Sequence, residues 1–171
     1  MYSVSSDKPR RVSAAPQSSV GAPCPVVIGG EHTLRLAYYL EAGRLAPEWK
    51  AMHVLPPRPN GSDELCAVVS FVRSYAHMSG RPNDEAFAGH PLAAGGLEPY
   101  SVFEIEGSSW LQDLVRMNSV HPYHKAERFD HLKHWVFSFH DTTFECIASS
   151  FTVALAQGTP WSVLEDAVNA E

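Results

Sequence analysis

The stretch HWVFSFHDTTFECIA (residues 134–148) decides the fold, because its residues alternate with the two-residue period of an extended chain. The alternation breaks at residues 141–143, where Asp and Thr favour a turn, and then resumes. The stretch therefore predicts a β-hairpin with an aromatic face toward the core. The residues on that face are Trp135, Phe137 and Phe139 before the turn, and Phe144, Cys146 and Ala148 after it.

The hairpin also supplies a candidate catalytic site made of His140, Asp141 and Glu145. We expect His140 and Glu145 to stand near each other across the turn. A carboxylate beside an imidazole orients the ring and favours its protonated form, which suits general base work or metal ligation. The alternative is a polar hairpin end that stabilises only its own turn.

The long loop before this hairpin holds a second polar group, with Asp84, Glu85 and His90 within residues 82–92. Carboxylate and imidazole groups are ligands for divalent ions, so His90, Asp84 and His140 form a candidate metal site. The implied cofactor is a divalent metal. The alternative is a Pro-Asn-Asp-Glu turn in which Asn and Asp stabilise their own backbone.

Other chemical signals are weak. His131 and His134 are three residues apart, but no HExxH pattern is present, and we expect surface histidines on a short helix. The sequence contains no G-x-S-x-G pattern for a nucleophilic serine. Cys146 follows an acidic residue and is expected to be an inert thiol.

Composition indicates a globular protein of 171 residues, with 44% hydrophobic and 19% charged residues. A net charge of −6 argues against nucleic acid as a partner, because nucleic-acid affinity depends on basic surfaces. No apolar run is long enough to cross a membrane, and no secretory signal is recognised. The three cysteines form no CxxC pair, which favours a reducing, cytoplasmic setting, and Cys66 and Cys146 are expected to be buried.

The remaining patterns predict an α+β domain with a mainly antiparallel, curved sheet of five or six strands and two or three short helices. Residues 1–22 are rich in Ser, Ala, Pro and basic residues and are expected to form a disordered arm before a single domain over 23–171. Strands are expected at 25–28, 32–40, 65–75 and 101–106, with a helix turn as the alternative at Leu36, Tyr39 and Leu40. Helices are expected after an N-cap at Ser109, over 125–133, and from Thr159 and Pro160 onward.

Five short motifs give the chain a likeness to other proteins: PNDE (82–85), GHPL (89–92), SSW (108–110), NSVHP (118–122) and FHDTTFECIA (139–148). In this order the motifs resemble those of a group of uncharacterised bacterial proteins. The resemblance covers residues 66–153 and implies a bacterial protein in which loop and hairpin form one recurring unit. It implies no activity and assigns no role to any residue.

Two function classes follow from these patterns. The first is a small ligand- or metal-binding domain, with or without enzymatic activity, whose polar site lies between loop 82–92 and the hairpin turn at 140–145. The second is a non-enzymatic protein-interaction or self-association module that buries an apolar face against a partner.

Overall fold

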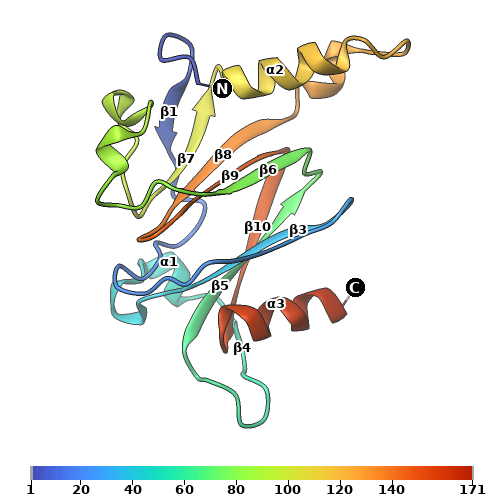
Figure 1. The fold of residues 1–171 in the computed structure, drawn as a ribbon. Coiled ribbons are helices and arrows are strands. Elements are labelled where there is room, and N and C mark those ends of the chain that lie inside the picture. Colours follow the sequence, from blue (N-terminus) through green and yellow to red (C-terminus); the bar gives the residue numbers. More distant parts are fainter. Residues whose placement is uncertain (1, 171) are drawn as a thin grey trace. The chain divides into compact units, whose positions relative to one another are not determined.

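The computed structural model describes residues 2–170, which form two compact units. The first unit contains the described residues up to Val12 together with Ser74–Ser150, and the second contains Ser13–Arg73 and the described residues from Phe151 onward. Within residues 2–170 there are two five-stranded sheets and three α-helices (Figure 1), which confirms the α+β class. The expected single sheet is thus replaced by two, and each unit is described by itself. The expectation of a single domain over 23–171 stays a prediction.

The sheet of the first unit has the strand order β1-β7-β8-β9-β6, and all four neighbouring pairs are antiparallel. The central position of β8 and β9 agrees with their continuous apolar character. The strands of this sheet are β1 (Lys8–Arg11), β6 (Ala76–Gly80), β7 (Val102–Glu106), β8 (Lys133–Ser138) and β9 (Thr143–Ala148).

Strands β8 and β9 form the hairpin expected from the alternating pattern. Ser138 pairs with Thr143, and the Phe139 amide donates to the Thr142 carbonyl at 2.9 Å, so the turn covers residues 139–142. Val136 lies opposite Glu145, as the faces expected from the sequence require. The strand after the hairpin, β10 (Ser150–Gln157), does not extend β9 but belongs to the sheet of the second unit.

Residues 1–22 were expected to form a disordered arm. Residue 1 lies outside the described residues, but residues 8–11 form strand β1, which corrects the prediction for this part of the segment. The basic residues of β1 lie opposite acidic residues of β7, with Lys8 paired to Glu106 and Arg10 paired to Glu104. Opposite charges across neighbouring strands favour pairing. Residues 8–11 show no alternation of apolar side chains. Opposite charges on β7 and backbone hydrogen bonds stabilise this edge strand in place of buried apolar side chains.

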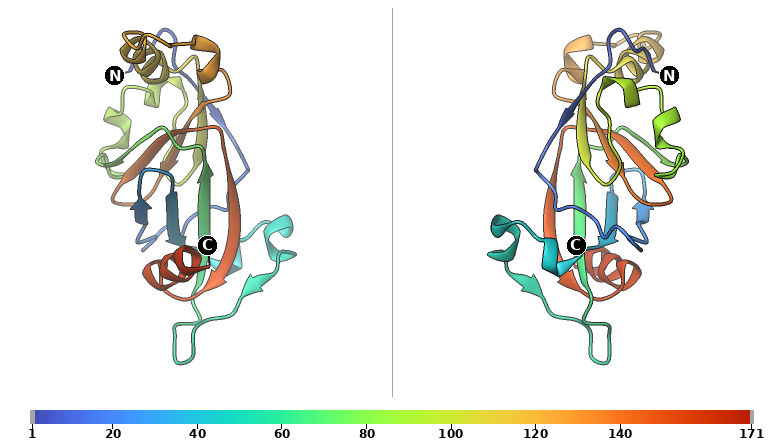
Figure 2. Two further views of the ribbon diagram at one scale, coloured as in Figure 1. Left: turned by 90° about the vertical axis from the view of Figure 1, so that its right-hand side faces the viewer. Right: turned by 90° about the vertical axis from the view of Figure 1, so that its left-hand side faces the viewer.

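Two apolar clusters cover one face of this sheet. In the first cluster, the loop after β6 packs on residues of β7 and β8. This loop contains the 3-10 helices η2 (Phe87–Gly89) and η3 (Ala93–Gly95). In the second cluster, helix α2 (Ser109–Asn118) and the 3-10 helix η4 (Ala126–Phe129) pack on Ile147 of β9. Figure 2 shows the loop after β6 in green and α2 in gold.

Both helices that were expected in this unit differ in detail. The N-cap of α2 is Ser108 instead of Ser109, because the Ser108 hydroxyl accepts the Leu111 amide proton at 3.1 Å. The expected helix over 125–133 is reduced to η4, and Lys133 already begins β8. Alternation in the strand therefore overrides the helical spacing of His131 and His134.

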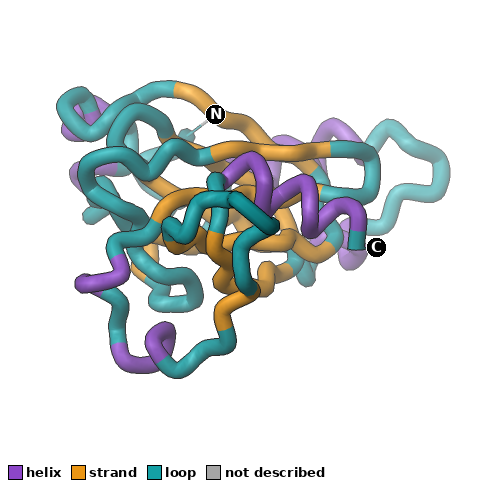
Figure 3. The backbone as a smooth tube through the Cα atoms, turned by 90° about the horizontal axis from the view of Figure 1, so that it is seen from below, coloured by secondary structure: helices purple, strands orange, loops and turns teal. Residues whose placement is uncertain are grey.

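The sheet of the second unit has the order β2-β3-β5-β10-β4, with β4 parallel to β10. Helix α3 is the last element of the chain (Figure 3) and packs on β3 and β5. It begins with the expected Thr159 cap and Pro160. None of the helices within residues 2–170 combines the length and apolar character needed to span a bilayer. The elements here are β2 (Val26–Gly29), β3 (Leu34–Tyr39), η1 (Ala42–Arg44), α1 (Pro47–Lys50), β4 (Val54–Leu55), β5 (Leu65–Val72), β10 and α3 (Pro160–Asn169).

Candidate functional site

Glu145 is the centre of the polar site in the first unit. It lies on β9 between the two apolar clusters, since Val136 opposite it belongs to the first cluster and Ile147 belongs to the second. The residue is 5% exposed. A buried carboxylate requires donors, because leaving it without partners costs several kcal/mol.

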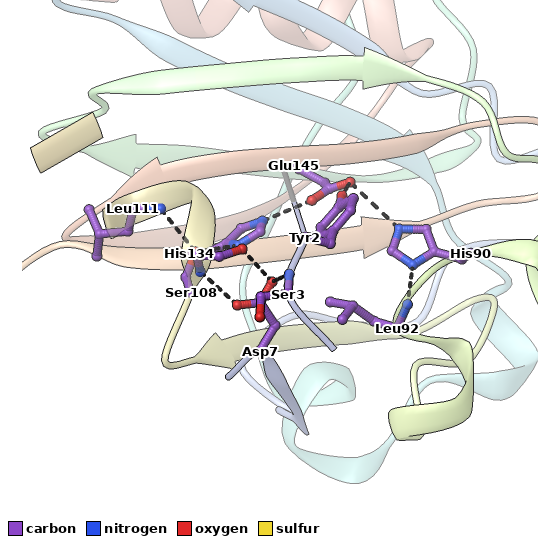
Figure 4. A network of polar contacts seen from close by, with 10 residues as sticks. Tyr2, Ser3, Asp7, His90, Leu92, Ser108, Leu111, His134 and Glu145 are labelled. Atoms are coloured by element: carbon purple, nitrogen blue, oxygen red, sulfur yellow. Dashed lines mark hydrogen bonds and ion pairs between the residues drawn. The ribbon is translucent and has the colours of Figure 1, made fainter. Parts of the chain in front are cut away.

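Three donor groups surround the Glu145 carboxylate (Figure 4). The Tyr2 hydroxyl donates to Oε1, and His134 Nε2 lies 2.8 Å from Oε2. His90 Nε2 faces Oε1 at 3.9 Å, which is longer than a hydrogen bond. The carboxylate is therefore bound by one phenol and one imidazole, and faces a second imidazole across a gap.

These partners keep Glu145 ionised. Burial raises the pKa of its carboxyl, but the hydrogen bonds from His134 and Tyr2, together with the His90 N–H that faces it across the gap, outweigh burial and lower the pKa to about 2. The result is a fixed negative charge inside the first unit at neutral pH.

The hydrogen-bond pattern also places the protons of the two histidines. The Leu92 amide donates to His90 Nδ1 at 3.1 Å, so in the neutral ring the His90 proton lies on Nε2 and points toward Glu145. On the other side, the ionised Glu145 can only accept, so His134 Nε2 also carries a proton. Both imidazoles thus present N–H groups to the same carboxylate.

Tyr2 enters the site from the N-terminal segment. Its ring meets His90 edge to face, with the ring centroids 5.0 Å apart, and lies nearly parallel to His134 at 6.5 Å. Burial and the charge of Glu145 raise the pKa of the Tyr2 hydroxyl well above its usual range, so the hydroxyl remains a donor. Downstream, Asp7 fixes the segment to α2 by accepting the Ser109 amide proton at 2.6 Å.

A pocket of about 350 Å³ opens beside Glu145. Glu145, His90 and Tyr2 line it, and most of its lining is apolar. A concave, mainly apolar pocket with a few converging polar groups is the usual form of a small-molecule site. The remaining lining residues are Met78, Arg81, Pro82, Ala86, Gly89 and Pro91.

The loop over 82–92 and the hairpin meet in space. The Asp84 amide donates to the His140 carbonyl at 2.8 Å, and the Thr143 hydroxyl donates to the Pro82 carbonyl at 3.1 Å. At the turn itself, the Asp84 carboxylate accepts from the Tyr100 hydroxyl, and His140 Nδ1 lies 3.2 Å from Asp141. This second cluster is separate from the one around Glu145.

The prediction that His140 lies near Glu145 is wrong, because the register of the hairpin places a different residue opposite Glu145. His140 lies within the turn, whereas Val136, four residues earlier, lies opposite Glu145. At about 3.3 Å per residue, four residues extend roughly 13 Å along a strand. The imidazole that binds Glu145 is therefore His134, a diagonal neighbour across the hairpin.

The residues expected to bind a metal are divided between the two clusters. His90 faces Glu145, whereas Asp84 and the backbone of His140 belong to the turn cluster. In the part of the chain that the structure describes, no three His, Cys, Asp or Glu side chains are grouped to hold a metal ion.

Sequence reasoning missed Tyr2 and His134 as site residues. His134 carries a recoverable signal, because it continues the alternation of Val136 and Ser138 and so shares their face. Tyr2 lies 143 residues from its partner Glu145, and no local pattern links them.

Searches against protein-family models, curated proteins and solved structures return no match to this chain.

Proposed function

We propose that the first unit binds a small, mainly apolar molecule that carries a hydroxyl group, with an aromatic alcohol of the phenol type as the best fit. The observation that supports this most directly is the 3.9 Å gap between His90 Nε2 and Glu145 Oε1 beside the pocket. A donor and an acceptor face each other there without a direct hydrogen bond.

A hydroxyl group matches this gap because it donates and accepts at once. It accepts the proton of His90 Nε2 and donates its own proton to Glu145. A carboxylate ligand would be repelled by the charge of Glu145, and an ether would leave the carboxylate without a new donor. The pair therefore selects alcohols over acids and ethers.

The walls of the pocket support an apolar or aromatic body for the ligand. Met78, Pro82 and Pro91 offer apolar surface, and the rings of Tyr2 and His90 offer aromatic contact. The volume of about 350 Å³ lies at the low end of the range for small-molecule sites. A single substituted ring is consistent with that size.

The proposal is tested by calorimetric titration of the full chain with three probes of similar shape. The probes are 4-methylphenol, 4-methylanisole and toluene, which offer a donor with an acceptor, an acceptor alone, and neither. We expect 4-methylphenol to bind more tightly than the other two. Equal affinity of all three probes, or no binding of any, would contradict the proposal.

Two substitutions locate the binding. His90→Phe keeps an aromatic ring but removes the donor, and Glu145→Gln removes the charge, so each is expected to abolish the preference for 4-methylphenol. Asp84→Asn is the matched control, because Asp84 belongs to the turn cluster and not to the lining of the pocket. It is expected to leave the preference unchanged.

A second candidate function is protein interaction or self-association through the end of α2 and the segment that follows it. Met117, Val120 and Tyr123 are 60%, 87% and 76% exposed within seven residues of chain. Such a cluster of exposed apolar side chains is typical of interaction surfaces. Sedimentation of the wild type and of a Val120→Ser, Tyr123→Ser double variant tests this candidate, which predicts a lower mass for the variant.

The other expectations stay predictions. They are a bacterial origin, a cytoplasmic location, the lack of nucleic acid as a partner, a divalent metal as cofactor, and catalytic roles for His140, Asp141 and Glu145.

A further inference from the structure

Ser108 lies at a sharp turn between a strand and a helix. Strand β7 ends at Glu106, Gly107 adopts a left-handed conformation with φ of 69°, and Ser108 then caps α2. A nucleophilic serine in α/β-hydrolases occupies a comparable strand-to-helix turn. The sequence around Ser108 lacks the usual glycine pattern, so the position is visible only in the fold.

Ser108, His134 and Glu145 form one continuous hydrogen-bonded relay. Ser108 Oγ lies 2.9 Å from His134 Nδ1, and His134 Nε2 lies 2.8 Å from Glu145 Oε2. Because Nε2 carries a proton toward the carboxylate, Nδ1 of the neutral ring is unprotonated and accepts the Ser108 hydroxyl proton. This is the arrangement of a nucleophile, a base and a group that orients the base.

The capping bond of Ser108 is compatible with this role. Leu111 donates its amide proton to a lone pair of Ser108 Oγ at 3.1 Å and does not use the hydroxyl proton. A donor at Oγ and the positive end of the helix both favour negative charge on that oxygen. The same contact that caps the helix therefore assists deprotonation of the serine.

The backbone amide that follows Ser108 has a partner within the chain. The amide of the residue after a nucleophilic serine commonly stabilises the oxyanion of acyl transfer. In this chain that residue is Ser109, and Asp7 covers it: Asp7 Oδ1 accepts the amide proton at 2.6 Å and Oδ2 accepts the Ser109 hydroxyl proton at 2.7 Å. A carboxylate oxygen of the chain itself thus occupies the oxyanion position.

We propose that Ser108 is the nucleophile of an acyl-transfer site that hydrolyses carboxylic esters, and that Asp7 restrains it. Ser108 Oγ forms a bond to the ester carbonyl carbon while its proton moves to His134 Nδ1. The bond from that carbon to the alkoxy oxygen then breaks, and the departing alcohol takes the proton from His134. Water repeats the sequence on the acyl-serine, which releases the acid and restores Ser108. Glu145 acts as a positioning residue through His134.

A second pocket provides room for the substrate. Ser108 and His134 both line a pocket of about 460 Å³ in the first unit. Leu111, Val115 and Leu132 contribute apolar surface to it. Apolar walls favour the acyl chain of an ester, and this pocket is distinct from the one proposed for the hydroxyl ligand.

The experiment uses a fluorophosphonate probe on the full chain, followed by intact mass and peptide mapping. In the expected reaction, Ser108 Oγ bonds to phosphorus, fluoride departs, and His134 receives the hydroxyl proton. We expect one adduct per chain, located on Ser108, and faster labelling in Asp7→Ala, because that change removes the carboxylate that accepts the Ser109 amide proton. Asp113→Ala removes another acidic side chain from the same region and is expected to label like the wild type.

Five further variants assign the roles. Ser108→Ala is expected to lose the adduct, while Ser109→Ala retains it. His134→Phe is expected to slow labelling by about 10²-fold or more, as loss of a general base does. Glu145→Gln is expected to label slowly and Glu145→Asp to recover part of the rate, which a purely structural role of the carboxylate would not require.

Absence of an adduct on Ser108 in both the wild type and Asp7→Ala, with near-ultraviolet circular dichroism showing both folded, would overturn the proposal. An adduct on any other residue in place of Ser108 would overturn it as well. Failure of this proposal and failure of the hydroxyl-ligand proposal are distinguishable, because Ser108→Ala removes the nucleophile but changes no residue that lines the pocket of His90 and Glu145.

Discussion

His134 and Glu145 occupy diagonal positions of the β8–β9 hairpin, and their side chains meet at 2.8 Å between Nε2 and Oε2. Both side chains are buried, with 0% and 7% exposure. In this setting, removing one partner leaves a buried polar atom of the other, Nε2 or Oε2, without its hydrogen bond, which costs more than the bond itself contributes. The pair therefore links the stability of the first unit to the chemistry of its site.

The ionisation of Glu145 predicts acid sensitivity. Its folded-state pKa of about 2 lies below the ordinary value of 4.5, so the stabilisation is complete above about pH 5 and is lost as pH falls toward 2. The lost free energy of unfolding is expected to be on the order of 3 kcal/mol. Urea unfolding between pH 6 and 2.5 should show a shallower pH dependence for Glu145→Gln than for the wild type. The exposed Glu127→Gln should match the wild type, and equal slopes for all three chains would refute the assignment.

Tyr2→Phe removes the hydroxyl donor of Glu145 while keeping the ring. A hydrogen bond to a charged group contributes about 1.5–3 kcal/mol, so the free energy of unfolding should fall by about that amount. Chemical denaturation measures the change. Tyr123→Phe, at an exposed tyrosine, serves as the control and should change stability little. Equal effects of the two substitutions would mean that the Tyr2 hydroxyl contributes nothing at Glu145.

Asp7→Asn should loosen the N-terminal segment from α2. Burial opposes ionisation of Asp7, but hydrogen bonds from Ser3, Ser109 and Ser6 outweigh burial and lower the pKa of its carboxyl. The amide side chain of Asn lacks the charge and replaces one acceptor with a donor, so the contacts with Ser109 weaken. Hydrogen exchange should become faster at the Ser109 amide and remain unchanged in α3. Unchanged exchange at Ser109 would show that the charge of Asp7 is not required.

Gly107→Ala should destabilise the first unit through two effects. The residue has φ of 69°, and a Cβ atom there would lie 2.5 Å from the Ser6 carbonyl oxygen. A left-handed conformation costs a residue with a side chain about 1–2 kcal/mol, and the clash with backbone adds to this. Thermal unfolding should show a lower midpoint than for Gly80→Ala, where a Cβ atom meets nothing within 4 Å. Equal midpoints would show that the close approach of Ser6 and Gly107 is dispensable.

Cysteine reactivity should separate Cys24 from Cys66. Cys24 is exposed, whereas Cys66 is buried and its thiol donates to the Gly158 carbonyl at 3.3 Å. Burial and the nearby charge of Glu64 raise the pKa of Cys66 to about 12, so little thiolate forms at neutral pH. Brief treatment with N-ethylmaleimide at pH 7.5 should modify Cys24 and spare Cys66, while both react in urea. Modification of Cys66 in the folded chain would contradict the buried assignment.

The sequence alone predicted the local elements of this protein well. Alternation identified β3, β7 and the β8–β9 hairpin, β-branched and aromatic composition identified β5, and the Thr159-Pro160 pair identified the start of α3. The burial of the thiols at Cys66 and Cys146 was confirmed too. These features follow from local spacing, since side-chain period and capping chemistry act within a few residues.

The tertiary structure decided which polar groups meet. Glu145 was recognisable as a candidate, but the sequence assigned it to His140, because the length of a turn and the register of a hairpin are not fixed by alternation. Its actual partners, Tyr2, His90 and His134, come from an N-terminal segment, a loop and a strand. Such contacts depend on strand order and on the closure of long loops, and neither leaves a periodic signal in the chain.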